Sequence, residues 1–150
     1  MPSGYHPAMR LRLLAVLAAC TLACAARAED YTRYLGSWSG PFLLYVADPD
    51  TGSQGSSMVY TGTLKIDADG TVRGGIADIG CVFSGSSADY LSPVNATIDL
   101  MASGCTDMRF NGHFVGKLIE NPPLKYGSLR LRSMRSLDAG VAQISAIVRH

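Results

Sequence analysis

Hydrophobic and polar residues alternate along most of the chain. The clearest example is "SWSGPFLLYV" (37–46), in which Trp38, Phe42, Leu44 and Val46 fall on one face. A repeat of two is typical of a half-buried β-strand, because successive side chains point to opposite faces. No segment after residue 28 repeats with the helical period of 3.6. The pattern therefore predicts an all-β protein.

The same alternation predicts further strands along the chain. They are expected at 58–66, 72–76, 80–86, 94–100, 105–110, 113–120, 124–133 and 141–149. The count is eight or nine, depending on whether "SGC" (103–105) is a bulge or a break. Short strands in sequence order favour an antiparallel up-and-down meander that closes into a small barrel, which removes exposed sheet edges.

Two turn motifs separate the expected strands. In "FNGHF" (110–114), Asn111 and Gly112 have the composition of a two-residue hairpin turn with positive φ at both positions. In "DADG" (67–70), the aspartates and the glycine resemble the start of a calcium loop. A calcium loop also needs a third ligand two residues on and a distal glutamate, which the sequence lacks, so a hairpin turn is favoured.

Three segments share the order turn, glycine, apolar residue and second glycine. They are "DGTVRG" (69–74), "GCVFSG" (80–85) and "NGHFVG" (111–116). Glycine at the end of each motif is expected to mark a bulge or a tight bend where a strand curls around a barrel.

An apolar run, "LLAVLAACTLACAA" (13–26), follows two arginines and ends just before the small residues of "ARA" (26–28). This arrangement predicts a signal peptide over 1–28 and one mature β-barrel domain over 29–150, in the periplasm or secreted, without stable membrane insertion. "LAAC" (17–20) leaves open the alternative of a lipoprotein anchored through Cys20.

Removal of the expected signal peptide changes the net charge and the number of cysteines. The mature chain keeps ten basic residues against 12 acidic ones, a net charge of −2, which argues against a nucleic-acid partner. In "KYGSLRLRSMR" (125–135), leucines interleave with arginines, so a solvated strand face is favoured over an anion site. Cys81 and Cys105 are the one pair left and are expected to form a disulfide. No metal site or cofactor is expected.

The segment "LGSWSG" (35–40) resembles the opening of calycins, the lipocalin and avidin-type barrels, whose first strand commonly begins Gly-x-Trp. "YTGTLKIDADGTVRGG" (60–75) is similar to the next strands of avidin-type barrels. This resemblance implies a small barrel that can carry a ligand. Avidins line the biotin site with several tryptophans, whereas this chain has only Trp38, so biotin binding is not expected. Lipocalins cover this tryptophan with a basic residue; Arg149 is the candidate, although the alternation turns it outward.

The combination of signal peptide, short barrel, Gly-x-Trp and one disulfide also resembles periplasmic inhibitors of secreted metalloproteases. These proteins block their target with an N-terminal segment. The matching region here is "EDYTRYL" (29–35). This second resemblance implies an inhibitor that binds a hydrolase.

Enzymatic activity has little support in the sequence. A nucleophilic serine needs a neighbouring base, and the mature chain offers only His113, beside a turn, and His150, its last residue. We therefore expect a non-enzymatic protein.

Two function classes remain. The favoured one is a protein-binding module, such as an inhibitor or immunity-type factor, whose partner contacts Leu43 and Tyr45 on the first strand and Asp48 and Asp50 in the glycine-rich loop 48–57. The alternative is a carrier that holds a small apolar ligand inside the barrel. That ligand would contact the inward residues Trp38, Phe42, Tyr60 and Phe114.

Overall fold

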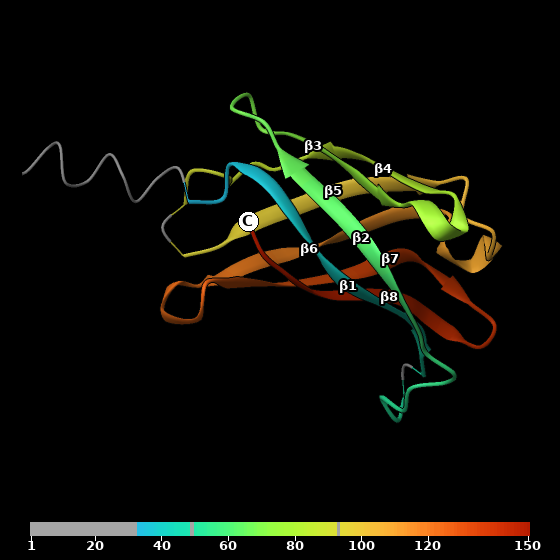
Figure 1. Ribbon diagram of the computed structural model, residues 1–150. Helices are drawn as coiled ribbons and strands as arrows, with labels where there is room; N and C mark the ends of the chain where they lie inside the picture. The colour runs from blue at the N-terminus through green and yellow to red at the C-terminus, as the bar shows by residue number, and fades with distance from the viewer. Residues whose placement is uncertain (1–32, 49, 93) are drawn as a thin grey trace, which may run out of the picture.

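The protein is a closed β-barrel of eight antiparallel strands in sequence order (Figure 1). The computed structural model describes residues 33–48, 50–92 and 94–150, so the expected signal peptide, Cys20 and most of 29–35 lie outside the described residues. The strands are β1 (Gly36–Ala47), β2 (Met58–Ile66), β3 (Thr71–Ile76), β4 (Cys81–Ser86), β5 (Ala96–Ser103), β6 (Gly112–Asn121), β7 (Tyr126–Leu137) and β8 (Gly140–Val148). The predicted fold class is confirmed, with eight strands.

Short 3₁₀ turns connect some strands: η2 (Ala77–Ile79), η3 (Met108–Phe110) and η4 (Pro122–Leu124). In the part of the chain that the structure describes, no helix has the length and apolar character needed to cross a membrane.

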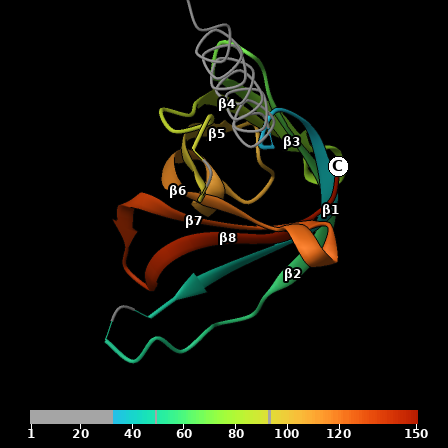
Figure 2. The same cartoon turned by 90° about the vertical axis from the view of Figure 1, so that its left-hand side faces the viewer.

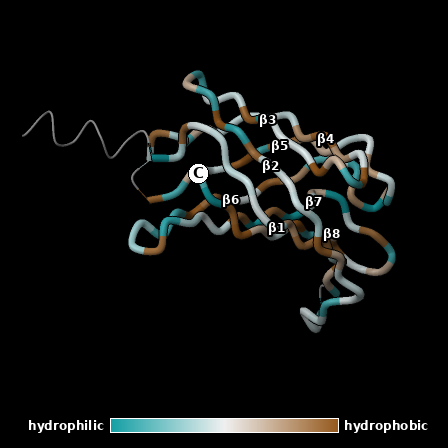
Figure 3. The backbone as a smooth tube through the Cα atoms, viewed as in Figure 1, coloured by the Kyte–Doolittle hydropathy of each residue, from teal (hydrophilic) through white to brown (hydrophobic). Residues whose placement is uncertain are grey.

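The alternation of the sequence fills the barrel with large side chains. Trp38, Phe42 and Phe114 point inward and are at most 1% exposed. The hydropathy colouring in Figure 3 changes repeatedly between apolar and polar along the strands, as one buried and one solvated face require. The core is thus the interior of the barrel itself.

Two inward glycines make room for the rings of β1. A Cβ atom at Gly62 would lie 2.6 Å from Cδ2 of Phe42, and one at Gly127 would lie 3.0 Å from Cζ3 of Trp38. Each aromatic ring therefore packs over a strand position that carries no side chain. A narrow barrel accommodates large inward residues on one strand by having glycine at the facing position of another.

The glycines that end the three recurring motifs have a related role. A Cβ atom at Gly74, Gly85 or Gly116 would lie between 1.8 and 2.1 Å from a carbonyl oxygen of the neighbouring strand. These positions thus allow a close approach of adjacent backbones, which accounts for the recurrence of glycine where the sheet curls.

The expected strand at 105–110 is wrong. After β5 the chain forms a loop that contains η3, and Asn111 ends this turn with a φ of −84° rather than the positive value predicted for a hairpin. The side chain of Asn111 explains the difference, because its oxygen accepts from the backbone N–H of Cys105 (2.9 Å) and its nitrogen donates to the Cys105 carbonyl (3.1 Å). The Asn-Gly pair thus closes a longer loop.

A second correction concerns Val94, which was expected to point inward. It precedes β5, which begins at Ala96, and is 67% exposed. Tyr34 donates a hydrogen bond to its carbonyl (2.8 Å), so the backbone of Val94 contributes to the barrel end while its side chain does not.

The predicted disulfide is confirmed. Cys81 begins β4 and Cys105 follows β5, and their sulfur atoms are bonded at 2.05 Å. Both residues are 3% exposed. A disulfide of this kind indicates an oxidising environment outside the cytoplasm.

The "DADG" segment forms the predicted hairpin turn between β2 and β3. The Gly70 N–H donates to the Asp67 carbonyl (2.9 Å), and Gly70 has a φ of 81°, which favours glycine. The Asp67 carboxylate binds Lys65 and Arg73, and the Asp69 carboxylate accepts from the Thr71 N–H (2.9 Å). Both carboxylates therefore make contacts within the hairpin that stabilise its turn.

Candidate binding surface

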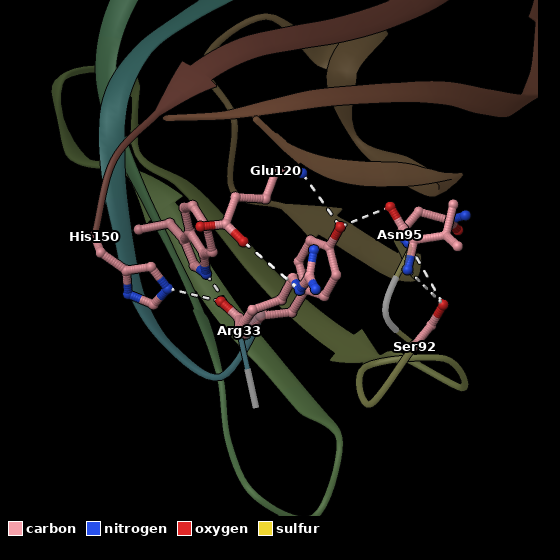
Figure 4. A network of polar contacts seen from close by, with 8 residues as sticks. Arg33, Ser92, Asn95, Glu120 and His150 are labelled. Carbon is pink, nitrogen blue, oxygen red and sulfur yellow. Dashed lines mark hydrogen bonds and ion pairs between the residues drawn. The ribbon is translucent and has the colours of Figure 1, made fainter. Parts of the chain in front are cut away.

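One end of the barrel is closed by aromatic side chains (Figure 4). The indole N–H of Trp38 donates to the Tyr34 carbonyl (3.0 Å), and the ring centroid of His150 lies 3.9 Å from that of Trp38. The hydroxyl of Tyr34 accepts from the Glu120 N–H (3.2 Å), and the ring of His150 contacts the carbonyl of Arg33 (3.0 Å). The start and the end of the described chain therefore meet over Trp38.

The residues expected to contact a carried ligand are part of the filled interior. Trp38, Phe42 and Phe114 are buried, and Tyr60 is half-buried and packs against the core. Phe42 also faces Phe83, with 6.1 Å between the ring centroids. These side chains use one another as packing partners, and they occupy the space where a carrier holds its ligand.

Leu43 and Tyr45 lie on the outer face of β1, as expected, but the expectation that Tyr45 is exposed is wrong. Leu43 is half-buried and Tyr45 is only 9% exposed. Tyr45 lies opposite Gln143 of β8, and its hydroxyl donates to Oε1 of Gln143 (3.0 Å). Truncating Tyr45 therefore removes contacts of the fold as well as surface.

Asp48 and Asp50 belong to the loop between β1 and β2, which extends away from the barrel (Figures 1 and 2). Oδ1 of Asp48 accepts from the N–H groups of Asp50 (2.8 Å) and Thr51 (3.0 Å). The hydrogen bond from Thr51, followed by that from Asp50, lowers the pKa of the Asp48 carboxyl. Asp48 thus caps the turn of its own loop, whereas Asp50 is exposed.

A hollow of about 520 Å³ lies on the outer wall of the barrel, across β2, β1, β8 and β7. Leu43, Tyr45, Val59 and Ile147 give it apolar sides. Small residues of β7 and β8, such as Ser128 and Ser145, also line it. The wall is hollowed here because short side chains stand between longer ones.

A second hollow of about 530 Å³ continues along the same wall over β6 and β7. It shares Ser128, Arg130 and Gln143 with the first hollow. Its other lining residues are Val115, Gly116, Lys117, Ile119, Leu131 and Arg132. We call the two together the outer-wall groove. The groove is apolar over β1 and β2, and over β6 and β7 it carries three cations, Lys117, Arg130 and Arg132, beside the apolar Val115 and Ile119.

The basic part of the groove follows from strand register. Lys117 lies directly opposite Arg130, and Arg132 lies two residues along the same strand. Like charges placed opposite each other destabilise a sheet. Among the described residues, no carboxylate forms an ion pair with any of these three cations. Nothing in the described fold neutralises this cluster.

Several basic residues outside the groove are paired with acids. Asp67 binds Lys65 (2.7 Å) and Arg73, and Asp107 binds Arg109 (2.6 Å). These contacts lower the pKa of the Asp67 carboxyl, with Lys65 as the largest cause, and the pKa of the Asp107 carboxyl through Arg109. Lys125, Arg135 and Arg149 outside the groove also form no ion pair with a described acid. The groove differs in the contrast with Lys65 and Arg73: these two also lie opposite each other but are both bound by Asp67, whereas no described acid binds Lys117 and Arg130.

His113 is the second residue of β6 and points outward. Its Nε2 lies 2.7 Å from Oδ1 of Asp99 on β5. Across the described residues, no group of three His, Cys, Asp or Glu side chains has a metal-binding arrangement. This imidazole–carboxylate pair lies on an exposed strand face.

Sequence reasoning identified part of this surface and missed the rest. Leu43, Tyr45 and Arg130 were noticed on separate segments, but Lys117, Val59 and Ile147 were not. The alternation marks each of them as an outward strand position. Only the pairing of strands far apart in the sequence brings them onto one wall.

Comparison with known proteins gives no match: no family model, no curated protein and no solved structure is similar to this chain. The eight-stranded antiparallel barrel is consistent with the calycin resemblance. Membership of that family stays a prediction.

Proposed function

We propose that the protein is a non-enzymatic binding module of the periplasm or the extracellular space, which engages a partner protein through the outer-wall groove. The observation that carries the proposal is the groove itself, where apolar side chains stand beside cations that the described fold does not neutralise. Protein interfaces combine apolar anchors with arginine in this way.

The filled interior supports binding on the outside of the barrel. The inward residues are packed against one another, so the space for a carried ligand is taken by the protein's own rings. The loop between β1 and β2 supplies a second contact region, because it projects beside the groove and its residue Gln54 lines the first hollow. Rigid barrels commonly present binding residues in this manner.

The class of partner follows from the resemblance to periplasmic inhibitors. An inhibitor or immunity-type factor against a hydrolase is the form of binding module that we favour. The disulfide supports a location outside the cytoplasm, where such targets are met.

Photo-crosslinking tests this proposal. A photoreactive amino acid replaces Val59, which is 62% exposed and lines the groove, in the protein expressed in its native host. The control places it at Val82 on β4, which is 56% exposed on another part of the wall. We expect one protein crosslinked from Val59 and not from Val82. Equal labelling from both positions, or none from Val59, would overturn the proposal.

A further inference from the structure

We propose that the partner inserts a short helix into the outer-wall groove. The helix carries acidic residues toward one end and apolar residues toward the other. This inference rests on the proposed function and specifies the chemistry of the partner.

The charge of the groove changes in one direction across the sheet. One row of directly paired residues runs Lys117, Arg130, Ser145, Leu43 and Val59, from β6 to β2. The row is basic at β6 and β7, small and polar at β8, and apolar at β1 and β2. An occupant that matches this row carries acidic groups at one end and apolar groups at the other.

The next row of paired residues adds one more cation at β7, beside an apolar residue at β6. Val115 lies opposite Arg132, Arg132 opposite Gln143, and Gln143 opposite Tyr45. Arg132 adds a third cation beside the Lys117–Arg130 pair. Bringing acids to these cations removes a repulsion that the free protein retains, so association stabilises the wall.

The length of the row fits a short helix. Five strands at a spacing of about 4.8 Å extend over about 19 Å. A helix rises about 1.5 Å per residue, so about 13 residues cover this distance.

The closed barrel favours a helix over an added strand. Lys117, Arg130, Ser145 and Leu43 all stand at positions that pair on both sides. A strand could add only at Met58–Gly62 of β2, which have no partner on the β3 side, and there it would not reach the cations. An extended segment lying on the face of the sheet leaves its own N–H and C=O groups unpaired above apolar side chains. A helix satisfies these groups internally.

The same features argue against two other occupants. In a symmetric pair packed groove to groove, the basic cluster of one copy would lie over either the apolar end or the basic cluster of the other, so neither arrangement brings an acid to the cations. A flat bilayer surface would leave the hollow floor at Ser128 and Ser145 unfilled. Acidic lipid is nevertheless included in the test, because it shares the negative charge.

The test selects a display library of 14-residue helical peptides on the mature protein. The selection is repeated on Lys117→Glu/Arg130→Glu, which keeps two like charges opposite each other and so matches the wild type in repulsion. Arg135→Glu/Arg149→Glu is the control: it makes the same change in net charge at exposed residues that do not line the groove. Circular dichroism and melting curves establish that all variants fold.

We expect the wild type and the control to enrich peptides with acidic residues at one end and apolar residues at the other. Binding of these peptides should weaken at least tenfold on Lys117→Glu/Arg130→Glu, which should enrich basic peptides instead. The inference is overturned if acidic residues are not enriched, or if the groove variant and the control bind the peptides equally. It is also overturned if vesicles of anionic phospholipid bind the wild type and compete with the selected peptides.

Crosslinking from Val59 separates the two proposals, because it does not depend on the charge of the partner. If Val59 crosslinks to one specific protein but the peptide selection shows no preference for acidic residues, only the inference of an acidic helix is overturned. Absence of the crosslink overturns the proposed function, whatever the peptides show.

Discussion

At the scale of residues, the interior accommodates the aromatic rings of β1 by placing them over glycines of β2 and β7. Phe42 lies over Gly62, and Trp38 lies over Gly127. The rings are at most 1% exposed, so they have little room to move aside. Each of these positions is therefore occupied by glycine because a larger side chain would overlap the aromatic ring.

Gly62→Ala tests this fit. The new methyl group would meet Cδ2 of Phe42 at 2.6 Å and Cγ1 of Ile76 at 3.0 Å, so the core must shift. We expect the free energy of unfolding to fall by about 1–3 kcal/mol, as overpacking does. Denaturant titration measures it. Phe42→Leu should offset part of this loss, so that the two changes are not additive; strict additivity would show that the ring and the glycine do not interact.

At the scale of elements, the β2–β3 hairpin carries a local charge cluster. The Asp67 carboxylate binds Lys65 and Arg73, which lowers its pKa below the usual 3.8. A carboxyl whose pKa is lower in the folded state stabilises that state above the unfolded pKa. This contribution is lost as the pH falls through the folded pKa.

Asp67→Asn therefore has a pH-dependent effect on stability. Near pH 6 the melting temperature of the variant should be lower than that of the wild type, because both ion pairs weaken. The difference should shrink below about pH 3.8, where the wild-type carboxyl also takes up a proton. Thermal melts at several pH values measure it, with Asp78→Asn on the exposed η2 turn as the control. A difference that stays constant with pH would contradict the role of the charge.

The disulfide joins the beginning of β4 to the loop after β5, with a sequence separation of 24. Replacing both cysteines with serine should lower the free energy of unfolding by about 3 kcal/mol, because the unfolded chain regains the entropy of an open loop of this size. Denaturant titration measures the change, and peptide mapping without reductant verifies the bond in the wild type. Unchanged stability would mean that the β4–β5 pairing alone holds this end together.

At the scale of the whole molecule, a rigid filled barrel presents its chemistry on the outside. The inward rings, the aromatic contact at Trp38 and the disulfide are buried, so the exposed chemistry of the described residues lies on the outer wall and in the loops. This arrangement is the reason that we favour a protein-binding barrel over a carrier.

Native mass spectrometry of the purified mature protein distinguishes these two functions. We expect the mass of the disulfide-bonded polypeptide without a stoichiometric small molecule, because Phe42, Phe83 and Phe114 fill the interior. Protein incubated with palmitate and then desalted is the control for retention of an apolar ligand. A lipid or metabolite that co-purifies in a one-to-one ratio would favour the carrier.

The sequence alone determined, for most strand residues, whether the side chain points into the barrel or outward. Alternation depends on each residue's own hydrophobicity, so Trp38, Phe42 and Phe114 were placed inward correctly. Local chemistry also identified the "DADG" turn, and the cysteine count identified the disulfide. These features need only neighbouring residues or a simple pairing rule.

The tertiary structure decided what lies side by side. The loop around Asn111 depends on hydrogen bonds to Cys105, and the burial of Tyr45 depends on Gln143, which is 98 positions away. The outer-wall groove likewise exists because the register of β6, β7, β8, β1 and β2 aligns cations with apolar residues across the sheet. Alternation determines on which face of the sheet a side chain lies, but only the pairing of strands distant in the sequence determines which side chains lie beside it.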